Sequence, residues 1–135
     1  MDDGAALILV KQDVDVVLAR QRGRELAAQA GFTGSNLTLI ATAISEIARN
    51  IVVYAGQGEL VISLAQDHER RGIKVVGSDQ GPGIPDIKLA MQDGYSTGRS
   101  LGLGLPGARR LMDDFEIFSE PGVGTTITMW KWLPS

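Results

Sequence analysis

Three short segments of the chain hold residues whose types and spacing could carry out chemistry. In the first, SEIARN (45–50), Glu46 and Asn50 lie four positions apart, so a helix would place them one turn apart on a single face. A carboxylate can take up a proton, and a carboxamide can be a sparse protein ligand for a metal ion. A solvated helix flank would explain the same pair, so this segment needs support from the other two.

The second segment, SDQGPGIPD (78–86), ends an apolar run with a carboxylate and continues into a turn rich in glycine and proline. Alternate residues of the strand IKVVGSD share one face, so we expect Asp79 at the edge of the core. A carboxylate there needs a donor, and the exocyclic amine of a flat ring is one. Three glycines would leave room for such a ring: Gly77, Gly81 and Gly83. A plain loop is the alternative.

The third segment, GLGLPG (102–107), formally matches the dinucleotide fingerprint G-x-G-x-x-G. It follows a polar stretch, however, whereas the fingerprint should follow a buried strand. Gly102 and Gly104 precede an expected helix, so free N–H groups and the positive end of the helix dipole could face an anion. The simple start of a helix is the alternative. Together, the three segments describe a site for an adenine nucleotide.

Composition limits the classes of protein to which the chain can belong. Its 135 residues fit one domain, 1–135, and a hydrophobic content of 44% is enough for a core. The net charge is −3 and lysine and arginine form no cluster, which disfavours a nucleic-acid partner. There is no cysteine, and the single histidine, His68, is expected in a solvated turn. The first apolar run, AALILV, is too short to cross a bilayer, so we expect a cytoplasmic protein without a membrane anchor.

Periodicity indicates the elements that position these segments. ALILV has the composition of a strand, and a helix is expected over about 14–30, with Gly31 as its stop. Its apolar positions at helical spacing are Val14, Val17, Leu18, Leu26 and Ala30. A second helix is expected over about 35–55, with a regular apolar seam at Leu37, Ile40, Ile44, Ile47 and Ile51. Glu46 and Asn50 then lie at the margin of the buried side, and Ser45 and Arg49 point further out.

The second half of the chain reads mainly as strands. ELVISLAQ and GIKVVGSD form a pair joined by a polar turn, and FEIFSE and TTITMWKW form another. Between the pairs we expect a short helical piece near 87–91, the polar run QDGYSTGRSLGLG and a helix over about 105–113. Strands in adjacent pairs favour antiparallel neighbours. We therefore predict a two-layer α/β sandwich with a mixed, mostly antiparallel sheet and helices on one face.

In this order, the elements resemble the GHKL ATPases, which share a Bergerat-type ATP-binding fold. SEIARN is similar to the N box of that family, DQGPGI to its first glycine box and GLGL to its second. GVGTTITMWKWLP resembles its terminal strand, with the Gly-Thr pair. The short chain and the segment GLPGARRLMDDF look most like the small bacterial serine/threonine kinases, namely the RsbT-type switch kinases of the stressosome.

The resemblance implies a role for each residue of the site. Glu46 would be the general base for an attacking serine hydroxyl, and Asn50 would bind the Mg²⁺ that bridges the phosphates of ATP. Asp79 would accept from the adenine amine, with Thr125 helping through water, while Gly81 and Gly83 clear the path of the ring. The backbone of five residues would hold the phosphates: Leu101, Gly102, Leu103, Gly104 and Leu105. Arg99 or Ser100 would add a phosphate contact, and the run QDGYSTGRSLGLG would order when ATP binds.

The resemblance also implies the partners. The substrate would be a serine on a small STAS-domain antagonist protein, and the released kinase would activate a downstream PP2C-type phosphatase. An anti-sigma kinase that binds an RNA polymerase sigma factor is an alternative, because the RsbW-type kinases share the same boxes. A binding module that has kept the fold and lost catalysis is a third possibility, although such a module need retain neither Glu46 nor Asn50.

Overall fold

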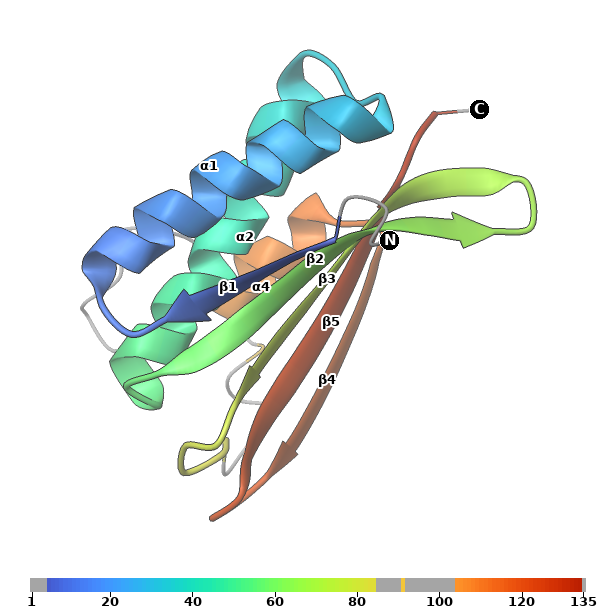
Figure 1. Cartoon of the computed structure of the whole chain (residues 1–135). Helices are drawn as coiled ribbons and strands as arrows, with labels where there is room; N and C mark the ends of the chain where they lie inside the picture. The colour runs from blue at the N-terminus through green and yellow to red at the C-terminus, as the bar shows by residue number, and fades with distance from the viewer. Residues whose placement is uncertain (1–4, 85–90, 92–103, 135) are drawn as a thin grey trace.

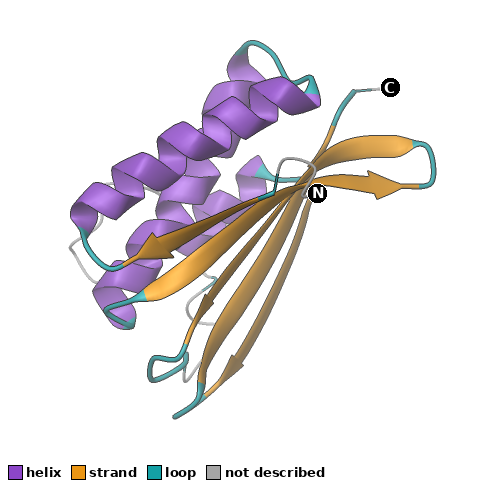
Figure 2. Cartoon of the chain, in the orientation of Figure 1, coloured by secondary structure: helices purple, strands orange, loops and turns teal. Residues whose placement is uncertain are grey.

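The computed structural model describes residues 5–84, 91 and 104–134, and they form a two-layer α/β sandwich (Figures 1 and 2). The strands are β1 (Ala6–Val10), β2 (Gly58–Asp67), β3 (Arg70–Asp79), β4 (Asp114–Glu120) and β5 (Gly124–Trp132). The helices are α1 (Asp13–Ala30), α2 (Ser35–Tyr54) and α4 (Gly104–Leu111). All three helices cover one face of the sheet, as the sequence predicted. The helical piece expected near 87–91 lies outside the described residues, apart from Met91.

The five strands form one sheet in the order β1-β2-β3-β5-β4, and every described pair is antiparallel. The sheet is therefore more regular than the mixed sheet that the sequence led us to expect. Short turns explain two of the four antiparallel pairs: His68 and Glu69 join β2 to β3, and Pro121–Val123 join β4 to β5. The register sets Asp79, the last residue of β3, opposite Gly58 of β2 and Thr125 of β5.

Helix α2 fills the centre of the core. Four isoleucines of its predicted seam are buried: Ile40, Ile44, Ile47 and Ile51. They meet the inward-facing residues of three strands, including Leu60, Ile62, Ile73, Val75 and Met129. By length and composition α2 is apolar enough to cross a bilayer, but half of the tested window is buried inside this fold. Its hydrophobicity is that of a core helix.

Helix α1 has the bounds that the sequence predicted but buries a different face. Val14, Val17 and Leu18 are 54%, 42% and 51% exposed, so this part of the predicted apolar stripe does not face the core. The buried positions are Val16, Ala19, Gly23, Leu26 and Ala27. Small residues dominate this face because α1 lies very close to α2. A Cβ atom on Gly23 would stand only 2.2 Å from Cδ1 of Ile44.

Candidate active site

Glu46 is the best-connected polar residue of α2. Its side chain is only 5% exposed, and its two carboxylate oxygens have different partners. Oε1 accepts the backbone N–H of Gly104 at 3.0 Å, and Oε2 accepts Nη1 of Arg49 at 3.0 Å. The first bond joins the middle of α2 to the first residue of α4. The N–H of Gly104 and the guanidinium of Arg49 therefore fix the orientation of the Glu46 carboxylate. A side chain that reacts with a bound substrate needs such a fixed orientation.

The two neighbours of Glu46 that we expected further out do not behave alike. Arg49 remains 38% exposed at its side chain, but it turns back to form an ion pair with Glu46. Ser45 is buried, 7% exposed, and its hydroxyl donates to the carbonyl oxygen of Thr42 at 2.8 Å. The outward placement of Ser45 was wrong, because α1 and α4 both pack on α2 and leave it little open surface.

Asn50 lies one helical turn beyond Glu46 and is half-buried. Within the described part of the chain, its carboxamide has no hydrogen-bond partner, so its oxygen is available to a ligand. The described residues also contain no group of three or more His, Cys, Asp or Glu side chains that could hold a metal ion. A single amide oxygen fits Mg²⁺ only where phosphates and waters supply the other ligands, which is the usual arrangement for nucleotide-bound Mg²⁺.

Asp79 is half-buried at the end of β3, as its position in the strand predicted. Its Oδ1 accepts the backbone N–H of Gly81 at 2.9 Å, and this bond shapes the turn that follows the strand. Within the described residues Oδ2 has no hydrogen-bond partner, so one carboxylate oxygen is free to accept from a ligand. This arrangement fits an exocyclic amine, which needs an acceptor held rigidly at the edge of the core.

The chain itself fills the space at the three glycines near Asp79. A Cβ atom on Gly77 would lie 2.6 Å from Cγ2 of Ile47, and one on Gly81 would lie 2.6 Å from Cβ of Ala55. One on Gly83, whose φ is +79°, would lie 2.6 Å from the carbonyl oxygen of Glu120. The room that we expected there for a ring is therefore occupied by protein. Gly77 instead lets β3 approach α2, and Gly81 and Gly83 let the following turn sit directly against Ala55 and the β4–β5 hairpin.

Thr125 is 5% exposed, and its place opposite Asp79 brings the two residues together across β3 and β5. Its Oγ1 lies 2.8 Å from Oγ of Ser119, and either atom can donate. Ser119 Oγ also accepts the backbone N–H of Ile84 at 2.7 Å. Sequence reasoning missed Ser119. The signal was its position on the inward face of FEIFSE, two residues after Ile117, where an apolar residue would be usual.

The start of α4 is the described part of the expected phosphate site. Gly104 has φ +68°, a conformation that glycine adopts at little cost, and Leu105 is buried. Pro106 is tolerated because the first turn of a helix has no intrahelical acceptor for its N–H. Five predicted phosphate contacts lie outside the described residues: Arg99, Ser100, Leu101, Gly102 and Leu103. The loop expected to order on ATP binding lies outside them too, except for Gly104.

Contacts along α2 connect these parts into one site. Ala55, just beyond the end of α2, faces Gly81, and Ile51 faces Gly58 at the start of β2. A Cβ atom on Gly58 would in turn lie 3.1 Å from Cβ of Asp79. The second half of α2 thus runs from the buried carboxylate to the end of β3. At one end of this site Asp79 can accept a hydrogen bond from an amine, and at the other end Glu46 can accept a proton.

Comparison with known proteins gives one family and several relatives. A family profile described as a histidine kinase-like ATPase domain matches residues 10–131. The serine/threonine-protein kinase RsbT of Bacillus subtilis is 48% identical over 93% of this chain and 95% of its own length. The anti-sigma F factor of Bacillus licheniformis is 36% identical over 78% of this chain and 76% of its own length.

Among solved structures, the NMR structure of the histidine kinase domain of the Escherichia coli osmosensor EnvZ is similar to this chain. It has a TM-score of 0.49 and 22% sequence identity, and the match covers 100% of this chain and 91% of that one.

Proposed function

The chain belongs to the histidine kinase-like ATPase domain family, and from that premise we propose that it is an ATP-dependent serine/threonine-protein kinase of the RsbT type. The observation that carries this proposal is the position of Glu46, a buried carboxylate bonded to the N–H that begins α4. It combines a proton acceptor with an anion-binding helix start, as transfer of a phosphoryl group from ATP to a hydroxyl requires.

In the proposed reaction, a serine hydroxyl of the substrate attacks the γ-phosphorus of ATP. The new O–P bond forms as the bond to the bridging oxygen of ADP breaks, and the hydroxyl proton passes to a carboxylate oxygen of Glu46. Arg49 keeps the carboxylate oriented through Oε2. The N–H of Gly104 turns from Oε1 to a phosphate oxygen, which frees Oε1 to accept the proton.

The nucleotide is held at both ends in this proposal. Asp79 accepts from the adenine amine through Oδ2, and Thr125 contributes through water. Asn50 would hold Mg²⁺, which would neutralise charge on the phosphates. The other phosphate contacts come from Arg99 or Ser100 and from the backbone between Leu101 and Leu105.

We propose that the substrate is a serine on a STAS-domain antagonist protein in a bacterial stress-signalling complex in the cytoplasm. The released kinase then activates a PP2C-type phosphatase. An anti-sigma kinase is the second candidate, because anti-sigma F factors are among the relatives. Incubation with radiolabelled ATP and each partner separates the two. A STAS protein that takes up phosphate, with no retention of a sigma factor, supports the first, and stable retention of a sigma factor supports the second.

Replacement of the proposed base tests the catalytic assignment. Glu46→Gln keeps the shape and an acceptor for Gly104, but it removes the basic oxygen. Phosphate transfer should fall by about 10²–10⁴-fold while ATP binding changes little. Transfer is measured with radiolabelled ATP, and binding by calorimetry. Glu116→Gln, on the exposed face of β4, is the matched control and should retain full activity. A fully active Glu46→Gln variant would contradict the assignment.

Replacement of the adenine acceptor should have the opposite effect. Asp79→Asn can still accept from Gly81 through Oδ1, but it presents an amide donor where Oδ2 stood. We expect ATP affinity to fall by about 10–100-fold, the cost of an unmatched buried polar group. At saturating ATP the transfer rate should largely recover. Unchanged affinity for ATP in calorimetry would remove Asp79 from the nucleotide site.

A further inference from the structure

Three polar side chains form a row across the end of the sheet. Asp79 of β3 pairs with Thr125 of β5, and Thr125 pairs in turn with Ser119 of β4. The three strands lie side by side in the sheet (Figure 1). Directly paired residues on one face have Cβ atoms about 4.5–5.5 Å apart, so neighbouring side chains of the row can interact. The reaction proposed above uses Asp79 and Thr125 but not Ser119.

The hydroxyl of Ser119 has three polar neighbours. Its Oγ accepts the backbone N–H of Ile84 at 2.7 Å and lies 3.2 Å from the carbonyl oxygen of Gly124, to which it can donate. The third neighbour is Oγ1 of Thr125, at 2.8 Å. A hydroxyl has one hydrogen and two acceptor positions. When Ser119 donates to Gly124 and accepts from Ile84, its remaining acceptor position is open to the hydrogen of Thr125.

This count of donors and acceptors favours one direction for the Thr125 hydroxyl. If Thr125 donates to Ser119, all three contacts of Ser119 are hydrogen bonds. If Ser119 donates to Thr125 instead, Gly124 loses its bond to Ser119 and one acceptor position of Ser119 stays empty. Thr125 is only 5% exposed, and buried polar groups are normally fully bonded. The Thr125 hydrogen therefore points to Ser119, and only the lone pairs of Oγ1 are left for a ligand.

We propose that Ser119 is a positioning residue for nucleotide selection, which makes the base-binding end of the site a set of acceptors only. The inference rests on the proposed function, in which this end of the site holds the base of ATP. Asp79 offers Oδ2, and Thr125 offers the lone pairs that Ser119 leaves free. The exocyclic amine of adenine has two hydrogens, so it can donate to both acceptors, directly or through water.

Hypoxanthine is the purine that this arrangement excludes. It has a carbonyl oxygen at C6 and a hydrogen on N1, where adenine has an amine and a lone pair. Its N1–H can turn to the carboxylate of Asp79, but its C6 oxygen then needs a donor. Thr125 has none to offer while its hydrogen is bonded to Ser119. A site with fixed, buried polar groups rejects a ligand that leaves such groups unpaired. Ser119 therefore completes a discrimination that Asp79 only begins.

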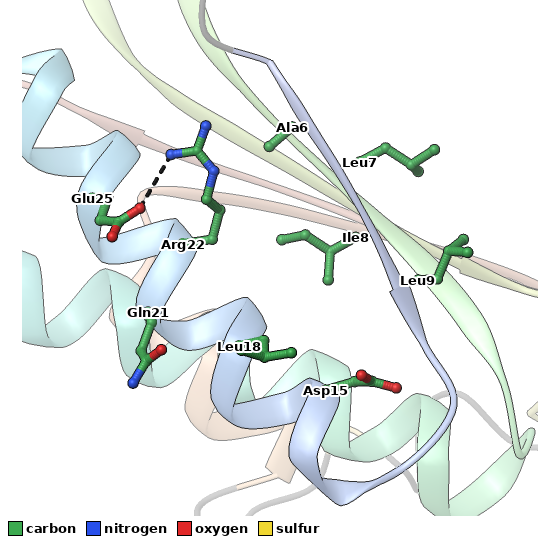
Figure 3. Close-up of a pocket in the computed structure, with 9 residues that line it drawn as sticks. All are labelled: Ala6, Leu7, Ile8, Leu9, Asp15, Leu18, Gln21, Arg22 and Glu25. Atoms are coloured by element: carbon green, nitrogen blue, oxygen red, sulfur yellow. Dashed lines mark hydrogen bonds and ion pairs between the residues drawn. The ribbon is translucent and has the colours of Figure 1, made fainter.

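The groove between β1 and α1, drawn in Figure 3, has no comparable pattern. It has a volume of about 510 Å³ and is lined mainly by aliphatic side chains, among them Ile8 and Leu18. Arg22 and Glu25 in its lining form an ion pair with each other, with N···O 3.2 Å. None of the described side chains that line it carries a hydroxyl group. A nucleotide bound in this groove would not respond to a change at Ser119.

Calorimetric binding of ATP and of inosine triphosphate, whose base is hypoxanthine, to the full chain tests the proposal. The wild-type chain should prefer ATP. Ser119→Ala frees the hydrogen of Thr125 to turn to the C6 oxygen, so the ratio of the two affinities should fall by about 3–10-fold. Loss of the bond to Ile84 would weaken both nucleotides alike, and this loss cancels in the ratio. Ser119→Thr keeps the hydroxyl and should keep the wild-type ratio.

Two further variants separate the role of the Ser119 hydroxyl from a general effect on the fold. Ser63→Ala is the matched control, because Ser63 follows the buried Ile62 and so lies on the opposite face of the sheet. It should leave the ratio unchanged. Thr125→Val removes the hydroxyl that Ser119 positions, so addition of Ser119→Ala to Thr125→Val should have no further effect on the ratio. Circular dichroism checks that each variant folds. If Ser119→Ala does not fold, Ser119→Cys takes its place, because a thiol is a weak acceptor of similar shape, and the ratio should again fall.

The outcomes distinguish this inference from the proposed function. A chain that binds ATP, with the same ratio in wild type and Ser119→Ala, would overturn the role of Ser119 and leave the kinase proposal standing. So would a wild-type chain that binds the two nucleotides equally, or a fall in the ratio that persists when Thr125→Val is already present. A wild-type chain that binds neither nucleotide would overturn both.

Discussion

Helices α1 and α2 lie side by side on the same face of the sheet, yet they use their apolar residues in opposite ways. Helix α2 buries large isoleucines between α1 and the sheet and carries Glu46 and Asn50 at the margin of that packing. Helix α1 buries mainly small residues and leaves Val14, Val17 and Leu18 outside. An apolar stripe therefore predicts a helix but does not say which of its residues the fold buries.

We expect the largest loss of stability from a substitution in the buried face of α2. Ile44 is fully buried and lies against Gly23 of α1. Ile44→Ala would leave a cavity that the close helix pair cannot fill, so we expect the free energy of unfolding to fall by about 2–5 kcal/mol. Denaturation in urea measures this loss. A change below about 1 kcal/mol would mean that α2 is packed less tightly than the structure indicates.

Two neighbouring valines on α1 test which face of this helix is buried. The same substitution, valine to alanine, can be made at both positions. Val16 is 7% exposed and Val17 is 42% exposed. Val16→Ala should lower the free energy of unfolding by about 1–3 kcal/mol, since it removes buried methyl groups. Val17→Ala should change it by no more than about 0.5 kcal/mol. Urea denaturation of both variants in parallel decides the matter, and the reverse ranking would show that α1 is rotated.

We expect the smallest effect on stability in the β2–β3 turn, which neither α1 nor α2 covers. Arg70 Nη2 lies 2.6 Å from Oδ2 of Asp67, and this hydrogen bond, together with the charges of Arg70 and His68, holds the pKa of Asp67 below its usual value. The stabilisation is present at neutral pH and is lost as the pH falls through that lowered pKa. Arg70→Ala should return the pKa of Asp67 toward its usual value in an NMR titration. No movement would exclude Arg70 as the cause.

Local patterns predicted the order of the elements well. The isoleucines of α2 repeat at helical spacing, Gly31 ends α1 with φ +113°, and alternating residues set the inward faces of β3 and β5. Such signals act over a few residues, so they can be read without knowledge of the rest of the fold. The position of Asp79 at the edge of the core followed from the same period of two.

The predictions that failed depended on distant parts of the chain. The buried face of α1 consists largely of alanine and glycine, which have little hydrophobic signal, and its selection depends on the close approach of Ile44. Gly77 and Gly81 were expected to leave open space, but Ile47 and Ala55 fill it. The bond between Glu46 and Gly104 spans 58 positions, so the site could be predicted as a set of residue types but not as a connected structure.

The position of β5 has a consequence for synthesis of the protein. This strand comes last of the five along the chain but sits inside the sheet, between β3 and β4. During translation, β3 therefore has an open hydrogen-bonding edge until residues 124–132 leave the ribosome. Asp79 and Thr125 cannot meet before then. A nascent chain stalled just short of β5 would hold all three described helices and still lack one side of the candidate site.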